Sequence, residues 1–461
     1  MIQYKDETIA AISTPPGEGG ISVIRMSGTS AFDVLIKIFQ PRSGISDLKN
    51  RHATFGWITN GLENIDDAMV TYFKNPNSYT GEDVVEISCH GSPFICKQIL
   101  ELLFQHGVRP AHPGEFTLRA FLNGKMDLAQ AEAVADLIHV KTEESRKVAA
   151  NQLNGAFSSR IKEIREKLIH VCSLLEIELD FTEEELEFTS KEETANLLRS
   201  IRNNIEELLK SYERGRVCKE GIRIVIAGKP NVGKSSLLNC LLDKERAIVT
   251  AIPGTTRDTV EDVMDIGGFL TYITDTAGMR QTQDPIEKEG IIRTERAIEN
   301  ADLVLFVLDK SHPITQEDIF LLTMIDNLKK KTFLIFNKID LPSVWEAEEI
   351  NWAHPGDFIF NISALKIIGI KDLIQALESA IGAGKFQLNE ETILTSARHR
   401  ECLIKSKEDI GKAELALIEK MSQEFIAMDI RGALNHLGEI AGQTVGEDII
   451  NNIFSKFCIG K

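Results

Sequence analysis

The chain has 461 residues, of which 43% are apolar, 26% charged and 7% aromatic, and its 52 Lys and Arg against 69 Asp and Glu give a formal net charge of −17. At about 150 residues per domain this length predicts about three domains. The acidity argues against an exposed nucleic-acid-binding surface, which would carry a basic excess. The net charge is −3 over residues 1–123, −7 over 221–384 and −7 over the remainder, so no segment is an acidic tail or a basic arm.

The cysteines are odd in number and scattered, without a Cys-x-x-Cys pair, which predicts neither a disulfide framework nor a structural zinc site. Residues 1–7 are polar and lack the apolar core of a signal peptide. No run of about 18 apolar residues exists that could span a membrane. We therefore expect a cytoplasmic protein without membrane attachment.

Residues 1–123 mix short apolar runs with Gly and Pro. Ile21–Arg25 and Val84–Ser88 are typical of strands, and Phe94–Gln105 is typical of a helix. This pattern predicts an α+β domain.

Two long stretches, 124–220 and 385–461, show helical spacing of apolar residues. Within the first, Ile161, Ile164 and Leu168 recur at this spacing. The two stretches form either one discontinuous bundle with another domain inserted into it, or two independent helical modules. We favour the single bundle, because neither stretch has a compact α/β pattern of its own.

Between these stretches, residues 221–384 alternate buried-strand runs with helical patterns. Arg223–Ala227, Leu303–Val307 and Phe333–Phe336 are continuous apolar runs, as in a parallel sheet that is covered on both faces. They predict a doubly wound α/β domain.

Gly228–Ser235 fits the P-loop pattern, and it follows a strand and precedes a helix, as the motif requires. Its glycines allow backbone N–H groups to surround phosphates. Lys234 supplies a charge near the β- and γ-phosphates, and the Ser235 hydroxyl reaches Mg²⁺. The N-terminus of the following helix adds a favourable dipole.

Three further motifs predict a Ras-like guanine nucleotide site. Asp275–Gly278 follows a strand, so that its carboxylate can hold Mg²⁺ through water. In Asn337–Asp340 the terminal carboxylate can accept hydrogen bonds from guanine N1 and N2, and Ser363–Leu365 offers a backbone amide to O6.

Gly254–Asp258 lies between these motifs and contains Thr256, the expected second Mg²⁺ hydroxyl and γ-phosphate sensor. Met279 follows Gly278, where Ras-like enzymes have a glutamine that orients the attacking water. Another group must do this. From composition alone, Asp284, Glu287 and Glu289 are equal candidates, and each is also consistent with a solvated acid.

The order of the nucleotide motifs and five further strings resemble the MnmE (TrmE) family of tRNA modification GTPases over the whole chain. The strings are Thr14–Gly17, Tyr79–Asp83, His112–Phe116, Arg119–Glu132 and the closing Phe457–Lys461.

The resemblance implies a K⁺-stimulated GTPase that acts with an FAD-dependent partner, MnmG. The pair adds a carboxymethylaminomethyl or aminomethyl group to C5 of the wobble uridine of certain tRNAs, with 5,10-methylenetetrahydrofolate as one-carbon donor and 5-formyltetrahydrofolate as its analogue. It further implies a homodimer formed through the folate-binding domain at 1–123, a heterotetramer or larger complex with MnmG, and tRNA held mainly by that partner.

The resemblance also implies site residues. Glu287 would orient the attacking water through a relay, and Asn231, Thr250, Ile252 and Thr255 would bind K⁺. The nucleotide site would comprise Asn231, Val232, Gly233, Lys234, Ser235, Ser236, Thr250, Ala251, Ile252, Pro253, Gly254, Thr255, Thr256, Asp275, Thr276, Ala277, Gly278, Asn337, Lys338, Asp340, Ser363 and Ala364.

For the folate the resemblance implies Arg25, Glu86, Lys125 and Lys461. A carboxylate such as Glu86 can accept the paired donors of a pterin, and cations suit the glutamate tail. Cys458 near this ligand is either a catalytic thiol or a residue that packs the tail of the chain.

Two other hypotheses fit the nucleotide motifs. A GTPase switch that only docks a ribosomal partner would carry a basic RNA-binding domain, such as one with a Gly-x-x-Gly loop, and none is visible. A membrane-remodelling GTPase would carry a long apolar or basic amphipathic face, which is also absent from the sequence.

Overall fold

The computed structural model of the chain describes residues 7–42, 48–180, 191–244, 261–275, 287–346, 350, 358–381 and 392–461. Backbone contacts divide the chain into two compact units. The first unit comprises Met1–Ile138, Gln152–Glu206 and Glu401–Lys461, and the second comprises His139–Asn151 and Glu207–Arg400.

The first unit contains a seven-stranded sheet with the order β3-β4-β5-β6-β2-β1-β7, in which only the β1–β7 pair is parallel among the described strands. The strands are β1 Ile9–Ile12, β2 Gly19–Ser27, β3 Phe39–Pro41, β4 Ala53–Thr59, β5 Asn64–Phe73, β6 Val84–Gly91 and β7 Arg109–Pro110. Helices α1 (Ala31–Ile38) and α2 (Pro93–Gln105) pack on this sheet. The predicted strands at 21–25 and 84–88 and the predicted helix at 94–105 are confirmed.

Alternation along β2 and β6 decides which side chains face the helices. Ile24, Met26 and Ile87 are fully buried in the core beneath α1 and α2. Arg25 and Glu86 lie between these positions and are direct cross-strand partners in the β2–β6 register. Since successive strand residues point to opposite faces, this charged pair lies on the face away from that core.

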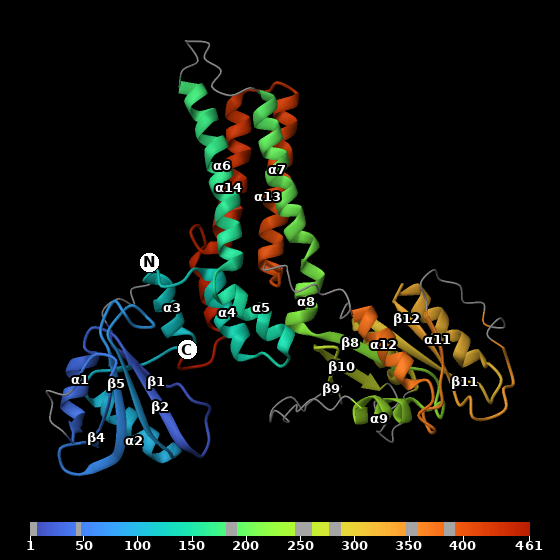
Figure 1. Cartoon of the computed structure of the whole chain (residues 1–461), viewed down its shortest axis with the longest axis horizontal. Coiled ribbons are helices and arrows are strands. Elements are labelled where there is room, and N and C mark those ends of the chain that lie inside the picture. Colours follow the sequence, from blue (N-terminus) through green and yellow to red (C-terminus); the bar gives the residue numbers. More distant parts are fainter. Residues whose placement is uncertain are drawn as a thin grey trace. The chain divides into compact units, whose positions relative to one another are not determined.

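The same unit contains helices from both ends of the chain. They are α3 Glu115–Leu122, α4 Leu128–Ile138, α6 Ala156–Asp180, α7 Lys191–Lys210, α13 Ala397–Ile418, α14 Gln423–Ala441 and α15 Glu447–Phe454. Figure 1 shows α6 beside α14 and α7 beside α13.

Side-chain contacts join the two halves of this helical bundle. Arg431 of α14 bonds Glu176 of α6 at 2.6 Å, and Arg202 of α7 bonds Glu414 of α13 at 2.9 Å. The apolar positions that gave the helical spacing, such as Ile164, are buried. The two sequence stretches therefore form one discontinuous bundle, as predicted, rather than two independent modules.

The second unit is built on a six-stranded sheet with the order β13-β12-β11-β8-β10-β9, in which only β9 is antiparallel to its neighbour among the described strands. The strands are β8 Ile222–Ala227, β9 Glu261–Ile266, β10 Phe269–Asp275, β11 Leu303–Asp309, β12 Thr332–Asn337 and β13 Phe358–Asn361. Its helices are α9 Lys234–Lys244, α10 Glu287–Asn300, α11 Gln316–Asn327 and α12 Ile370–Ile381. The predicted strands at 223–227, 303–307 and 333–336 are confirmed.

Each central strand of this sheet supplies two cores. Along β8, Ile224 and Ile226 enter one core, and Val225 and Ala227 enter the core on the opposite face. Both faces are therefore covered, which explains the continuous apolar runs in the sequence. The predicted doubly wound α/β domain is confirmed.

Two helices that the sequence assigns to the helical stretch belong wholly or mostly to the second unit instead. They are α5 (Glu143–Leu153), whose Val148 packs against the core of the second unit, and α8 (Tyr212–Glu220). The compact units thus do not follow the expected boundaries at 124, 221 and 385 at every point, and the division into domains at those boundaries stays a prediction. Within the described residues, no helix is long and apolar enough to cross a membrane.

Candidate functional site: a guanine nucleotide pocket and a charged site at the N-terminal sheet

The loop from Gly228 to Gly233 leaves the end of β8 and leads into α9. Gly228 has φ +146° and Gly233 has φ +101°, which side chains other than glycine rarely adopt. A Cβ on Gly233 would lie 2.2 Å from Nδ2 of Asn337, and one on Gly228 would lie 2.5 Å from the carbonyl oxygen of Val307. The glycines thus permit both the backbone shape and the close approach of its neighbours.

Lys234 begins α9 and is buried. Its Nζ donates to the carbonyl oxygens of Gly228 at 2.7 Å and Lys229 at 2.8 Å. Beside it, the Ser235 hydroxyl donates to Oδ2 of Asp275 at 2.7 Å. A hydroxyl and a carboxylate in contact are oxygen ligands of the kind that Mg²⁺ prefers, so these two residues fit the predicted metal position.

The Asn337–Asp340 motif follows β12 and meets the P-loop. Asn337 is 2% exposed, donates from Nδ2 to the Val232 carbonyl at 2.8 Å and accepts the Ala364 amide on Oδ1 at 3.0 Å. Lys338 donates from Nζ to the Asn231 carbonyl at 2.8 Å. These contacts hold three loops, far apart in sequence, around one space.

Lys338 also pairs with Asp309 at the end of β11, at 2.6 Å. Burial alone would raise the pKa of Asp309, but hydrogen bonds from Lys338 and Ser311 keep this pKa below its ordinary value. The carboxylate therefore stays charged at neutral pH and fixes the lysine, which lines the cavity.

The loops enclose a cavity of 580 Å³, a size typical of small-molecule sites. Ten of the predicted nucleotide residues line it: Asn231, Gly233, Lys234, Ser235, Ser236, Asn337, Lys338, Asp340, Ser363 and Ala364. Four further residues line it that the predicted residue set leaves out: Gly228 and Pro230 of the P-loop motif, Leu365 of the Ser363–Leu365 motif, and Leu341, which directly follows Asp340.

Several predicted residues lie outside the described part of the chain, so their positions stay a prediction. They are Thr250, Ala251, Ile252, Pro253, Gly254, Thr255, Thr256, Thr276, Ala277 and Gly278. Glu287 begins α10, but its side chain also lies outside the described part.

A second charged site lies on the N-terminal sheet. Arg25 donates to Oε1 of Glu86 from Nε at 3.0 Å and from Nη2 at 2.8 Å. The rings of Tyr79 and Phe116 lie 5.3 and 5.8 Å from the Arg25 guanidinium carbon. The pair therefore has an aromatic surrounding, in which cation–π contacts also hold the guanidinium.

The last residues of the chain return to this sheet. The Ser13 hydroxyl donates to the Gly460 carbonyl at 3.0 Å, and the Phe116 amide donates to the Lys461 backbone oxygen at 3.2 Å. Gly460, with φ +93°, is needed there because a Cβ would lie 2.3 Å from the carbonyl oxygen of Ile12. The exposed Cys458 accepts the Gly114 amide on its carbonyl at 3.4 Å.

Burial, and next the charge of Arg25, lower the pKa of Lys461, while Glu86 and Cys458 act in the opposite direction. The structure thus brings together Arg25, Glu86 and Lys461, three of the four residues predicted for the folate. Lys125 instead donates from Nζ to the Pro76 carbonyl at 2.9 Å, on the loop before β6.

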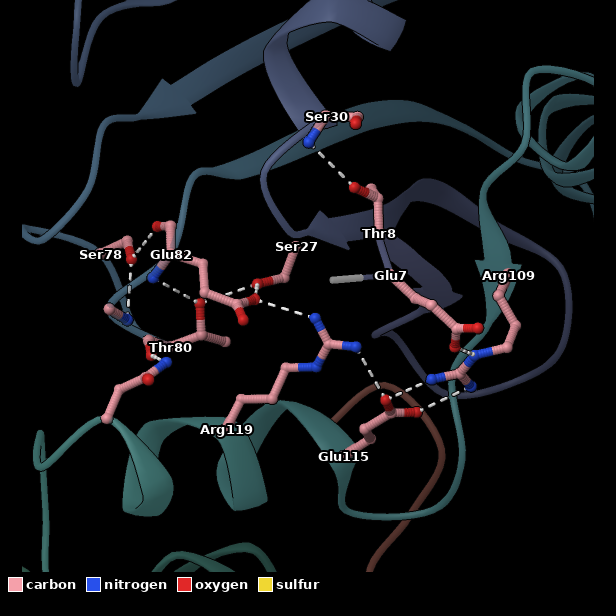
Figure 2. A network of polar contacts seen from close by, with 12 residues as sticks. Glu7, Thr8, Ser27, Ser30, Ser78, Thr80, Glu82, Arg109, Glu115 and Arg119 are labelled. Carbon is pink, nitrogen blue, oxygen red and sulfur yellow. Dashed lines mark hydrogen bonds and ion pairs between the residues drawn. The ribbon is translucent and has the colours of Figure 1, made fainter. Parts of the chain in front are cut away.

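Figure 2 shows a polar network around α3, beside this charged site. Glu115, only 1% exposed, accepts Arg109 Nη2 at 2.6 Å and Arg119 Nη2 at 2.9 Å. Arg119 also bonds Glu82 at 3.0 Å, and Glu82 accepts the Ser27 hydroxyl at 2.7 Å. The network ties α3 to β2, to β7 and to the loop that carries Tyr79.

Comparisons with known proteins cover the whole chain. A family model described as the MnmE helical domain matches residues 128–458, and one described as the GTP-binding protein TrmE N-terminus matches residues 8–125. A tRNA modification GTPase MnmE of Natranaerobius thermophilus is 43% identical over 458 residues, which cover 99% of this chain and 100% of the relative. The chain belongs to the MnmE family of tRNA modification GTPases.

Further members of the family are equally similar. The relative in Clostridioides difficile is 43% identical over 460 residues, covering 99% of this chain and 100% of its own. That in Flavobacterium psychrophilum is 43% identical over 462 residues, covering 99% of both chains. The family that the motifs predicted is confirmed, and its full-length match explains why one chain carries both the nucleotide pocket and the charged N-terminal site.

We predict that Glu115→Gln destabilises the α3 region by about 3 kcal/mol at neutral pH, because two buried or half-buried guanidinium groups lose their shared charge. Burial alone would raise the pKa of Glu115, but hydrogen bonds from Arg109, the His112 amide and Arg119 lower it below its ordinary 4.5. This stabilisation is therefore fully present above pH 4.5 and is lost as the pH falls through the lower, folded-state value.

Native-state hydrogen exchange of the α3 amides, measured in the full chain at several pH values, checks this prediction. The matched control is Glu143→Gln, since Glu143 pairs with Arg146 at 2.7 Å on an exposed helix surface. We expect the control to leave the stability nearly unchanged, because water screens this exposed pair. Equal effects of the two substitutions would contradict a special role of the buried network.

Proposed function

We propose that the chain hydrolyses GTP as a component of the machinery that modifies C5 of the wobble uridine in certain tRNAs. The observation that carries the proposal is the enclosed pocket formed by the P-loop, Asn337–Asp340 and Ser363–Ala364 in a chain that matches tRNA modification GTPases over its whole length. As a member of this family the chain is a GTP hydrolase that acts in tRNA modification.

The proposed roles in the pocket follow from the positions of its groups. Asp340 accepts the N1 and N2 hydrogens of guanine, and the stem of Lys338 covers the base. Lys234 moves its ammonium from the loop carbonyls to the β- and γ-phosphate oxygens. Ser235, Asp275 and Thr256 would hold Mg²⁺, and the bound ion would supply positive charge beside these phosphates.

Glu287 is proposed to orient the attacking water. Met279 stands where Ras-like enzymes have a glutamine for this role, and its apolar side chain cannot perform it. Asn231, with Thr250, Ile252 and Thr255, is proposed to hold K⁺ beside the phosphates. Asn231 lines the cavity, and its backbone has φ +63°. A cation there offsets the charge for which other GTPases use an arginine finger.

The charged N-terminal site is proposed to bind 5,10-methylenetetrahydrofolate. Glu86 has carboxylate oxygens for the paired donors of a pterin, and the rings of Tyr79 and Phe116 offer apolar faces beside it. Arg25 and Lys461 would receive the negative glutamate tail. Lys125, whose ammonium bonds the Pro76 carbonyl on the loop before β6, would be a further cation for this tail. The alternative is a purely structural cross-strand pair between Arg25 and Glu86.

Cys458 is proposed to assist the one-carbon transfer. Its side chain is exposed while its carbonyl is fixed by the Gly114 amide, so the thiol is accessible on an anchored backbone. The alternative, that Cys458 packs the tail, agrees less well with an exposed side chain.

The proposed assembly is a homodimer through the N-terminal domain, with the FAD-dependent MnmG in a heterotetramer or larger complex in the cytoplasm. The tRNA would be held mainly by the partner, because the net charge of this chain is −17.

We predict that Lys234→Ala lowers GTP hydrolysis by at least about 100-fold, since it removes the charge at the phosphates. Mass spectrometry of tRNA nucleosides from cells with only this variant is then expected to show loss of the C5 substituent on the wobble uridine. Lys371→Ala on the exposed face of α12 is the control and keeps both activities. Normal modification with Lys234→Ala would separate GTP turnover from the tRNA chemistry.

We predict that K⁺ in place of Na⁺ raises the hydrolysis rate by about tenfold or more, because a bound cation stabilises charge that develops at the phosphates. Asn231→Gly removes the side-chain ligand while tolerating φ +63°, and it is expected to abolish this difference between the two salts. Steady-state phosphate release in the two salts measures this. A variant that retains the full difference would exclude Asn231 as a K⁺ ligand.

We predict that Glu86→Gln and Lys461→Ala each weaken binding of 5-formyltetrahydrofolate by about tenfold, the value of one charge-assisted hydrogen bond. Isothermal titration calorimetry on the full chain measures the affinity. Lys37→Ala, on the exposed face of α1 in the same domain, is the control. Unchanged affinity in both site variants would leave the structural ion pair as the role of this cluster.

A further inference from the structure

One contact of the P-loop comes from outside all nucleotide-binding motifs. Lys229, at the start of the P-loop, pairs through Nζ with Oδ2 of Asp318 at 2.7 Å. Asp318 lies in the first turn of α11 and is fully buried, with its side chain only 1% exposed. Lys229 does not line the nucleotide cavity, so this ion pair does not belong to the site that touches the nucleotide.

Thr315 holds the Asp318 carboxylate in addition to Lys229. Asp318 accepts the Thr315 amide at 2.9 Å and the Thr315 hydroxyl at 2.8 Å, which forms the capping box of α11. Leu321, Leu322 and Ile325 hold the helix in the core of the sheet. All three bonds fall on Oδ2, and among the described residues Oδ1 is buried without a hydrogen-bond partner. Within this part of the chain, the Lys229 ammonium is the positive charge that pairs with the carboxylate.

The backbone of Lys229 contacts Lys234, the P-loop lysine that lines the nucleotide cavity. The Lys229 carbonyl accepts the ammonium of Lys234 at 2.8 Å. The residues around it are held in unusual conformations, with φ +146° at Gly228 and φ +63° at Asn231. Such a backbone persists only where its surroundings fix it.

Each part of the loop has its own support. Asn337 binds the Val232 carbonyl and Lys338 binds the Asn231 carbonyl, both near the end of the loop that leads into α9. Among the described residues, the Lys229–Asp318 pair is the side-chain ion pair that holds the beginning of the loop.

We propose that Lys229 is a positioning residue for nucleotide binding: by anchoring the start of the P-loop to α11 through Asp318, it keeps the loop in its binding shape when the phosphates are absent. A loop without this anchor must be ordered by the nucleotide itself, and that cost appears as weaker binding and faster release. The chemical step, in which the phosphates already hold the loop, depends much less on the pair.

The test measures release of N-methylanthraniloyl-GDP from the full chain by stopped flow. Lys229→Ala is expected to release this probe about tenfold faster, the value of one hydrogen bond to a charged group, and to raise KM for GTP with kcat little changed. Lys229→Arg keeps the charge and the donor and is expected to restore slow release.

A double-mutant cycle separates the anchor from a general loss of stability. Asp318→Asn keeps an acceptor for Thr315 but loses the charge, and it is expected to match Lys229→Ala, with no further effect when the two are combined. The matched control is Lys330→Ala. Lys330 is also half-buried and donates to the Glu299 and Ala301 carbonyls at 2.5 and 3.0 Å, just before β12 and hence at the end of the sheet opposite the P-loop.

The control variant is expected to lower thermal stability without changing release of the probe. Unchanged release from Lys229→Ala, additive effects of Lys229→Ala and Asp318→Asn, or equally fast release from Lys330→Ala would each overturn the proposal.

Discussion

The nucleotide pocket depends on one buried side-chain amide. Asn337 donates to the P-loop through Nδ2 and accepts from the guanine loop through Oδ1, so both halves of the amide are used. An aspartate would lack the donor and an aliphatic residue would lack both groups, and either would leave a buried backbone group without a partner. The same amide explains Gly233, since Nδ2 occupies the space that a Cβ would need. Two motifs far apart in sequence therefore constrain each other through a single contact.

The N-terminal site depends in a similar way on the first turn of α3. Backbone amides at the N-terminus of a helix have no partner within the helix. At the start of α3, the amides of Gly114 and Phe116 instead donate to the backbone oxygens of Cys458 and Lys461. On the same turn, Glu115 holds Arg119, which in turn holds the loop with Tyr79. One short helix thus fixes both the end of the chain and an aromatic wall beside Arg25.

The sequence predicted those features that depend on local pattern. Continuous apolar runs identified β8, β11 and β12, because a strand covered on both faces has no polar positions. Fixed motif spacing identified the pocket residues. Local pattern says nothing of tertiary partners, however. Helix α5 has the expected helical sequence, but only the contact of Val148 with the second core shows where it packs.

The sequence pattern also does not predict which side chains contact one another. Arg119 and Glu115 were recognised only as parts of family strings, since nothing in the spacing tells that Arg109 and Glu82 complete a buried network with them. Lys229 occupies one of the unspecified positions of the P-loop pattern, and its partner Asp318 lies in a different motif, the capping box of α11. Lys125 was predicted for the folate site with Arg25, and the sequence pattern did not indicate that its ammonium bonds the Pro76 carbonyl.

The N-terminal site brings two cations, Arg25 and Lys461, close to each other in a chain whose net charge is −17. There, Arg25 pairs with Glu86, and the charge of Arg25 also acts on the Lys461 ammonium. Burial and the neighbouring Arg25 both disfavour the charged form of Lys461, which is why its pKa is lowered. A negative ligand beside the two cations offsets their repulsion and raises that pKa again.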